Sequence, residues 1–298
     1  MKKVAYFPGC SLAGMDAEYD HASRLAALLL GIELVEVEDW SCCGATSAHS
    51  TDHELSVLMP ARTLGIVEKM GLDTLTAPCA SCYSRFVTTG HKLKEDRELA
   101  SRIMPELGIS SPDAVKVRSL LHMIADMPRD FIKEKIKLEL PGLRPACYYG
   151  CLLSRPSAVV GEAHPESPVM MDDLMALTGA RPVKWYHKTE CCGAALSIPR
   201  TDVVLELTSR LMKRAGEAGA NCIVTACPLC FTNLDLRQSQ AREYSKETGP
   251  PVPVFYFTEL MALAMGAPRG KLGFGKHAVD PVPLLDEALK AQAVEGGK

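Results

Sequence analysis

The sequence predicts an α/β fold of two pseudo-symmetric β/α domains, each with a mostly parallel sheet and a cysteine site at the carboxyl ends of its strands. Two observations predict it. Short apolar strands alternate with amphipathic helices, which favours parallel strands joined by right-handed crossovers. One series of cysteine motifs also occurs twice in the same order, which indicates an internal repeat. We place the first domain at residues 1–140 and the second, with a C-terminal tail, at residues 141–298.

Length and composition limit the possible functions. A chain of 298 residues with 47% hydrophobic content is long enough for two domains with ordinary cores. Its net charge of -3 leaves no basic excess for phosphates, so we expect no nucleic-acid partner. The longest apolar run, residues 25–32, is far shorter than the about 20 residues of a membrane-spanning helix, and the N-terminus has no secretory signal core. We therefore expect a soluble, cytoplasmic protein.

The first half has its cysteines directly after its expected strands. In chain order these are strand Lys3–Phe7 before Cys10, strand Glu33–Val37 before Cys42 and Cys43, and strand Thr74–Ala77 before Cys79 and Cys82. An amphipathic helix over residues 55–71 precedes the third strand. Strand Val115–Val117 and helix Leu120–Met127 close the half.

The second half repeats this order. Its groups are strand Pro145–Tyr149 before Cys151, strand Val183–Tyr186 before Cys191 and Cys192, and strand Ile223–Thr225 before Cys227 and Cys230. The corresponding helix covers residues 204–219, and strand Val252–Tyr256 with helix Glu259–Met265 closes the half. The carboxyl ends of parallel strands meet at one edge of a sheet, so we expect the five thiols of each half to converge there.

Five thiols in each half are compatible with more than one kind of site. A disulfide between adjacent cysteines is strained, and a reducing cytoplasm opposes it. Zinc binds C-x-x-C pairs but closes at four ligands, whereas each half offers five cysteines. Iron–sulfur clusters take thiolate ligands, although neither half has the close cysteine run of a ferredoxin. The residues therefore favour an iron–sulfur site of an uncommon kind, with zinc in at least one half as the alternative.

The order Gly-Cys, then Cys-Cys-Gly, then C-x-x-C, present twice, is similar to the cysteine-rich CCG domain family. A chain of two such domains resembles the B subunit of heterodisulfide reductase, and the segments FYFTELMALAMG (255–266) and GFGKHAVDP (273–281) are similar to that protein as well. The resemblance covers residues 1 to about 285. It implies a non-cubane 4Fe-4S cluster in each domain. It also implies that a substrate disulfide lies between the two clusters and is cleaved reductively, each sulfur being captured by a cluster iron.

The resemblance implies the ligands and the partners too. Five cysteines would hold each cluster: Cys10, Cys42, Cys43, Cys79 and Cys82 in the first domain, and Cys151, Cys191, Cys192, Cys227 and Cys230 in the second. The chain has neither a ferredoxin motif nor a G-x-G-x-x-G fingerprint, so its electrons must come from another polypeptide. The expected source is a ferredoxin-like iron–sulfur protein similar to the C subunit of heterodisulfide reductase, with a flavin protein similar to the A subunit behind it. The expected substrate is a small disulfide of the CoM-S-S-CoB type or similar.

Other functions are compatible with the same motifs. The chain could be an electron-relay CCG protein of a lactate- or glycolate-oxidising system. It could instead be a related protein of sulfur metabolism that acts on a lipoyl disulfide. A zinc-bearing scaffold is the fourth interpretation.

Several residues outside the repeated motif are weaker candidates. Cys147 and Cys222 stand within expected strands, where packing is the ordinary role of a small buried thiol. Polar side chains near the cysteines could donate hydrogen bonds to a cluster or an anionic substrate, although a surface role is the simpler interpretation for each. These candidates are His49, His53, His187, Lys188, Arg155 and Arg200. The Gly-Ala after each cysteine pair permits unusual backbone conformations and a close approach to a bulky cluster.

Overall fold

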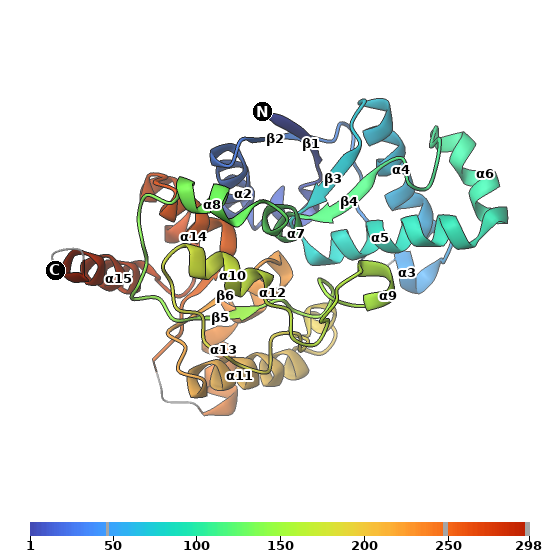
Figure 1. The fold of residues 1–298 in the computed structure, drawn as a ribbon. Helices are drawn as coiled ribbons and strands as arrows, with labels where there is room; N and C mark the ends of the chain where they lie inside the picture. The colour runs from blue at the N-terminus through green and yellow to red at the C-terminus, as the bar shows by residue number, and fades with distance from the viewer. Residues whose placement is uncertain (46–47, 247–249, 296–298) are drawn as a thin grey trace.

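The chain folds into two halves (Figure 1), and the described residues of the first form four strands and eight helices. The structure is a computed structural model that describes residues 1–45, 48–246 and 250–295. The elements of the first half are β1 (Lys2–Tyr6), α1 (Gly9–Leu12), α2 (Ala17–Leu29), β2 (Ile32–Glu36), α3 (Ala48–Thr51), α4 (Leu55–Lys69), β3 (Thr74–Ala77), α5 (Ala80–Glu95), α6 (Arg97–Leu107), β4 (Lys116–Ser119), α7 (Leu120–Ala125) and α8 (Arg129–Lys135).

The second half follows the same plan with shorter strands. Its elements are β5 (Pro145–Tyr148), α9 (Ser157–Val160), α10 (Met170–Leu177), the 3-10 turn η1 (Ala194–Leu196), α11 (Thr201–Glu217), β6 (Cys222–Thr225), α12 (Pro228–Leu234), α13 (Gln238–Ser245), β7 (Val254–Tyr256), α14 (Phe257–Ala264), the 3-10 turns η2 (Arg269–Lys271) and η3 (Phe274–Lys276), and α15 (Val282–Glu295). Among the residues that the structure describes, no helix is long and apolar enough to cross a membrane.

Each half is built on its own parallel sheet, which confirms the predicted fold class. The first sheet has the strand order β2-β1-β3-β4, and the second has the order β5-β6-β7. Every strand pair is parallel, with Ala5 opposite Leu75 in the first sheet and Ala146 opposite Ile223 in the second. The carboxyl ends of the strands in each sheet therefore share one edge, as the sequence predicts.

The predicted strand Val183–Tyr186 is wrong as a regular strand. The segment runs beside β5, where the N–H groups of Arg181 and Val183 donate to the Leu143 and Pro145 carbonyls, each over 2.9 Å, but no regular strand forms. One side chain explains this. The Trp185 indole N–H donates to the Cys147 carbonyl at 3.0 Å, where the backbone N–H of the same residue would have continued the ladder.

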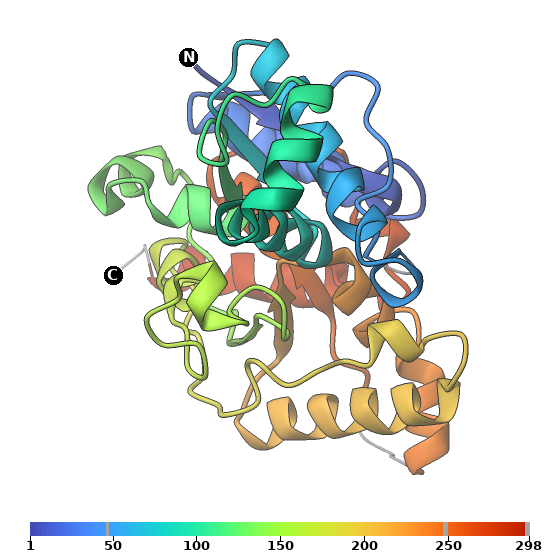
Figure 2. The same cartoon turned by 90° about the vertical axis from the view of Figure 1, so that its right-hand side faces the viewer.

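The two halves pack together through equivalent elements, in a pseudo-twofold arrangement. Helix α2 of the first half packs against α14 of the second, and α7 of the first packs against α10 of the second. In the repeat, α2 corresponds to α10 and α7 to α14, so each contact is the counterpart of the other. Figures 1 and 2 show the halves stacked with these helices between the two sheets.

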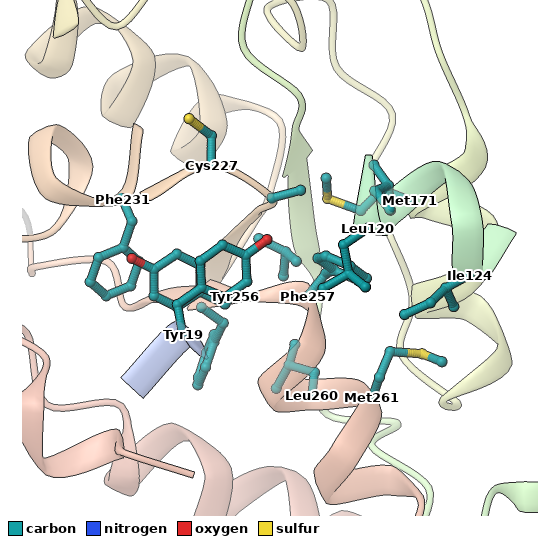
Figure 3. Packing of buried hydrophobic residues seen from close by; sticks show 14 of the residues in the cluster. Tyr19, Leu120, Ile124, Met171, Cys227, Phe231, Tyr256, Phe257, Leu260 and Met261 are labelled. Atoms are coloured by element: carbon teal, nitrogen blue, oxygen red, sulfur yellow. The ribbon is translucent and has the colours of Figure 1, made fainter. Parts of the chain in front are cut away.

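An aromatic stack lies at the centre of this junction (Figure 3). The Tyr19 ring of α2 lies parallel to the Tyr256 ring at the end of β7, with centroids 3.9 Å apart. Phe231 of α12 stacks on the other side of Tyr256 at 4.2 Å. All three rings are buried, and a single hydrophobic cluster continues from them through both halves. Stacked, buried rings of this kind contribute both burial and specific ring contact.

Hydrogen bonds fix the position of Tyr256 in the stack. Its backbone N–H donates to Glu259 Oε2 at 2.8 Å, and the other oxygen of Glu259 pairs with His277 Nε2 at 2.9 Å. This buried pair joins the two C-terminal segments FYFTELMALAMG and GFGKHAVDP. The Tyr256 hydroxyl donates to Asp16 Oδ1 of the first half at 3.0 Å. Burial raises the pKa of Asp16 to about 7.

Replacing Tyr19 with alanine should loosen the junction. The substitution deletes a fully buried ring from the stack, so we expect the free energy of unfolding to fall by about 3–5 kcal/mol. Chemical denaturation measures the change. Tyr244 on α13 is 52% exposed, and Tyr244→Ala as the control should change stability by less than about 0.5 kcal/mol. Equal losses in the two variants would contradict this account of the junction.

Replacing Asp16 with asparagine should change how stability depends on pH. Because the pKa of Asp16 is about 7 in the folded protein and lower in the unfolded chain, the carboxyl favours folding at low pH. That contribution is lost as the pH rises from about 4 to about 7. Asparagine does not ionise and still offers an oxygen to Tyr256. Asp16→Asn should therefore raise Tm at pH 8, with little effect at pH 4.

Thermal denaturation at several pH values checks this expectation. Asp113→Asn is the matched control, because it makes the same substitution at a side chain that is 72% exposed. A pH profile that is unchanged in Asp16→Asn would show that the buried carboxyl does not titrate as described.

Candidate metal centre

Five thiols of the first half lie just beyond the carboxyl ends of strands β1, β2 and β3. Cys10 lies in α1 directly after β1, and Cys42 and Cys43 lie in the loop after β2. Cys79 follows β3 as the N-cap of α5, and Cys82 is in the first turn of that helix. The predicted strand-end positions of these five cysteines are therefore all present in the structure.

The second sheet places the other five thiols in the same way. Cys151 comes shortly after β5, and Cys191 and Cys192 lie in the loop that follows the irregular segment beside β5. Cys227 is the N-cap of α12 after β6, and Cys230 is in the first turn of that helix.

Equivalent thiols come together in the two halves. The sulfurs of Cys43 and Cys82 are 3.1 Å apart, and those of Cys192 and Cys230, their counterparts, are 3.6 Å apart. Each pair joins the second cysteine of a Cys-Cys-Gly motif to the second cysteine of a C-x-x-C motif. The repeat thus reproduces the geometry of the thiols as well as their order.

The glycine of each Gly-Cys motif keeps the space beside the inner thiol free. Gly9 and Gly150 have φ of 68° and 67°. A Cβ at Gly9 would lie 3.2 Å from the Cys82 sulfur, and one at Gly150 would lie 3.0 Å from the Cys230 sulfur. A side chain at either position would press on the sulfur and would also strain the backbone.

The glycine of each Cys-Cys-Gly motif turns its N–H back to a sulfur. The N–H of Gly44 donates to Cys42 Sγ at 3.4 Å, and that of Gly193 donates to Cys191 Sγ at 3.2 Å. Both glycines have positive φ, 76° and 80°, which other residues adopt at a cost. The repeated glycine therefore has a defined role, since it allows the loop to bond the first sulfur of the pair.

Hydrogen bonds between thiols favour the thiolate at specific positions. The Cys151 thiol, 4.0 Å from the Cys191 sulfur, and the N–H groups of Gly193 and Ala194 lower the pKa of Cys191 to about 6. The Cys82 thiol lowers the pKa of Cys43 to about 7. Thiolates are the form of cysteine that binds metal. Cys43 and Cys191 therefore combine the donor type with the ionisation that metal binding requires.

The two thiol sets meet at their C-x-x-C motifs. Cys79 and Cys227, which are equivalent in the repeat, are close enough across the junction of the halves for each thiol to shift the pKa of the other. The neighbouring thiols of Cys230 and Cys79 are the main cause that holds the pKa of Cys227 well below its ordinary value. The two thiol sets are therefore neighbours at the point where the halves meet.

Exposure is graded across each set. Cys10 and Cys191 are exposed at the rim, whereas Cys43, Cys79, Cys82 and their counterparts are buried. All twelve cysteines of the chain are free thiols. Each site is thus open to solvent at one end and closed at the end where the two halves meet.

The donors fit an iron–sulfur group better than a single ion. Each set offers five sulfurs and has glycine-lined space beside its inner thiol. Within the described ranges, no three His, Cys, Asp or Glu side chains lie as a preformed site for one metal ion. Iron–sulfur clusters are held by cysteine thiolates, so a set of five thiols in each half is compatible with a cluster.

Most of the polar side chains near the cysteines form hydrogen bonds or ion pairs with residues other than the thiols. Lys188 is buried and its Nζ lies 2.7 Å from Asp172 Oδ1, so it belongs to a structural ion pair. His187 Nδ1 contacts Glu190 Oε1 at 2.7 Å. Arg155 bonds Glu166 and Thr189, Arg200 bonds Asp202 at the surface, and His53 is exposed. The side chain of His49 lies outside the described residues.

The two cysteines outside the motif are buried within strands, as predicted. Cys147 lies in β5 and Cys222 in β6, and both are fully buried. Burial raises the pKa of each thiol above its ordinary value. Both therefore fit a packing role as neutral thiols.

Sequence reasoning missed two residues that lie next to the thiols. The Tyr148 hydroxyl donates to the Glu190 carbonyl at 2.6 Å. Burial raises the pKa of Tyr148, and the nearby thiols of the second half raise it further. Asp16 lies near Cys227. The repeat could have indicated Tyr148, which is equivalent to Phe7, but no local pattern distinguishes Asp16, whose partner Tyr256 is 240 positions away.

Comparison with known proteins identifies the family. A family model described as a cysteine-rich domain, CCG, matches residues 4–86 and again 146–235. The chain is 32% identical to the 8-methylmenaquinol:fumarate reductase membrane anchor subunit of Wolinella succinogenes, over 95% of this chain and 99% of that protein. It is 30% identical to the B subunit of the ferredoxin:CoB-CoM heterodisulfide reductase of Methanosarcina mazei, over 98% of this chain and 99% of that protein.

More distant similarities agree with this result. The probable glycolate oxidase iron-sulfur subunit of Bacillus subtilis is 22% identical over 79% of this chain and 50% of its own length. A hypothetical protein from Helicobacter pylori has the same fold, with a TM-score of 0.73 at 11% identity over 94% of this chain. This chain spans about half of that protein, 52%. The chain therefore belongs to the cysteine-rich CCG domain family, as a relative of the heterodisulfide reductase B subunits that carries the domain twice.

Proposed function

We propose that this chain is the catalytic iron–sulfur component of a disulfide reductase. Each half would hold one non-cubane 4Fe-4S cluster through its five cysteines, and a small disulfide would be reduced between the two. The observation that carries the proposal is the nearness of Cys79 and Cys227 at the junction of the halves, beside the stacked rings of Tyr19 and Tyr256. Two sites on opposite faces could not act on one bond.

The stoichiometry of the reaction supports a paired site. Reduction of R-S-S-R′ takes two electrons and two protons and yields R-SH and R′-SH. Iron–sulfur clusters, when bound, supply electrons one at a time and offer iron to sulfur ligands. A pseudo-twofold site therefore matches a bond with two sulfurs, one facing each half.

The relatives support the class of reaction. The Methanosarcina protein is named for a CoB-CoM heterodisulfide, so we propose a heterodisulfide of that type or a similar small disulfide as the substrate. That protein is also named as one component of a larger reductase. We propose that electrons reach this chain from a separate ferredoxin-like iron–sulfur protein with a flavin protein behind it, and that the complex is cytoplasmic.

A second function has specific support. The Wolinella relative is named as a component of a fumarate reductase, and the Bacillus relative as a component of glycolate oxidase. In an electron relay the same two clusters would pass electrons without binding a disulfide. Release of thiols from a disulfide by the purified complex separates the two functions.

The metal content of anaerobically purified protein tests the proposal directly. Two four-iron clusters give about eight irons and eight labile sulfides per chain, with EPR signals on reduction or oxidation. With a one-electron viologen donor, the protein should release two thiols per disulfide consumed. Zinc without labile sulfide would reject the proposal, and clusters without thiol release would favour the relay.

Single cysteine replacements should remove one cluster at a time. Cys43→Ser and Cys192→Ser each delete an inner ligand, so we expect iron to fall to about half and disulfide cleavage to reach background. Cys222→Ala is the matched control, because that thiol is buried in β6 away from the motif. It should keep both clusters and cost about 1 kcal/mol of stability for the lost sulfur. Loss of iron in the control, or full iron in both ligand variants, would contradict the assigned ligands.

A further inference from the structure

One charged side chain near the thiols of the first half has a buried hydrogen-bond donor without an acceptor. Arg85 lies on α5 three residues after Cys82, so the two side chains share one face of the helix. The Arg85 Nη2 donates to the Ser56 carbonyl of α4 at 2.7 Å. Its Nε is buried and has no acceptor among the residues that the structure describes. The guanidinium is therefore anchored at one nitrogen and unsatisfied at another.

A proline in α4 makes the Ser56 carbonyl available to Arg85. In a regular helix the carbonyl of residue 56 accepts from the N–H of residue 60, but that residue is Pro60, which has no N–H. The Arg85 guanidinium supplies a donor in its place. The contact of α4 with α5 therefore fixes where the guanidinium lies.

The second half has a neutral residue at the equivalent position. The repeat aligns Arg85 with Asn233 on α12, since each comes three residues after the second cysteine of its C-x-x-C motif. Asn233 is buried, and both ends of its amide are bonded. Its Nδ2 donates to the Cys192 carbonyl at 2.9 Å, and its Oδ1 accepts from the Ser197 hydroxyl at 3.1 Å. The position thus faces the Cys-Cys-Gly loop of its half, and in the first half it carries a charge.

The charge of Arg85 acts on the thiols of its own half. Burial lowers the pKa of Arg85, but a guanidinium stays protonated in proteins. The sulfurs of Cys43 and Cys82 are 3.1 Å apart on the side of α5 that Arg85 shares. The Cys82 thiol is the main cause that lowers the pKa of Cys43 to about 7, and the Arg85 charge acts in the same direction. A cation at this place therefore favours negative charge on the sulfurs of the first half.

A buried cationic donor without an acceptor points to a group that would accept from it. Leaving such an N–H unpaired in a protein interior costs free energy, and nearly all buried polar groups have a partner. The sulfurs of an iron–sulfur cluster accept hydrogen bonds, and such bonds help to set the reduction potential of the cluster. Reduction adds negative charge, which a nearby cation stabilises.

We propose that the Arg85 Nε–H donates to a sulfur of the first-half cluster and raises the reduction potential of that cluster. The proposal rests on the two clusters of the proposed function. Asn233 brings no charge to the second-half cluster, so the equivalent position acts on one half alone. The two sulfurs of a bound disulfide then face clusters that differ in how readily they accept an electron.

Pulsed EPR on protein with isotopically labelled arginine tests the hydrogen bond itself. Cys192→Ser, which is expected to retain the first-half cluster, isolates the signal of that cluster. A weak coupling between the cluster spin and an arginine nitrogen should be present without any substrate and should change with the nitrogen isotope. It should be lost in Arg85→Lys in the same background, because lysine keeps the charge but has no Nε–H of a guanidinium.

Redox titration followed by EPR measures the effect on the potential. Arg85→Asn gives the first half the neutral residue of the second, so the potential of the first-half cluster should fall. A tenfold change in a one-electron equilibrium corresponds to about 59 mV, and we expect a shift of about this size. Arg85→Lys should lower the potential less, and neither variant should move the potential of the second-half cluster.

Arg102→Asn is the matched control, because it makes the same substitution on α6 at a side chain that is 57% exposed, and both potentials should keep their wild-type values. Unchanged potentials in Arg85→Asn with full iron content, or no arginine coupling in the labelled protein, would overturn the inference and leave the proposed function intact. Protein that never assembles clusters would overturn both. If Arg85→Asn loses iron, the labelled protein alone decides, since it carries no substitution in the first half.

Discussion

The stacking of Tyr19 on Tyr256 is the contact on which the arrangement of the two halves depends. Neither ring belongs to a thiol site, yet the stack brings α2 and β7 together beside both C-x-x-C motifs. The Tyr19 hydroxyl is directed at the Pro78 carbonyl, next to Cys79, and Phe231 in the same stack is the neighbour of Cys230. The hydrophobic contact between the halves therefore sets the distance between the two thiol sets.

The second half carries the hydrogen bonds that hold this contact. Glu259 caps the start of α14 through the Tyr256 N–H and is itself held by His277 from the segment beyond η3. In the first half the equivalent cap is Ser119, whose hydroxyl bonds His122 Nδ1 at 2.6 Å, with Glu162 of the second half nearby. The helix after the last strand of each half thus begins beside a residue of the other half, since Tyr256 bonds Asp16 and His122 Nε2 lies 3.8 Å from Glu162 Oε2. Such reciprocal contacts resist a sliding motion that would separate the thiols.

Much of this architecture could be predicted because the repeat gives the same information twice. The order of strands, helices and cysteines identified the two sheets and all ten thiols at their edges. Strand Val183–Tyr186 failed because the Trp185 indole takes a carbonyl of β5 in place of a backbone N–H, which a pattern of apolar residues does not reveal. The burial of Asp16 was beyond prediction, because it depends on Tyr256, a residue from the other half.

The covalent link between the halves has a consequence for symmetry. Two copies of a single CCG domain could form the same junction as a homodimer, and each copy would then present an identical residue on the axis. A Ser119 cap in one half and a Glu259 cap in the other are impossible in such an assembly. Joining the copies in one polypeptide lets the two sides diverge while the shared interface stays intact. A duplicated and fused chain can therefore treat the two ends of a bound molecule differently, which a symmetric dimer of one gene product cannot do.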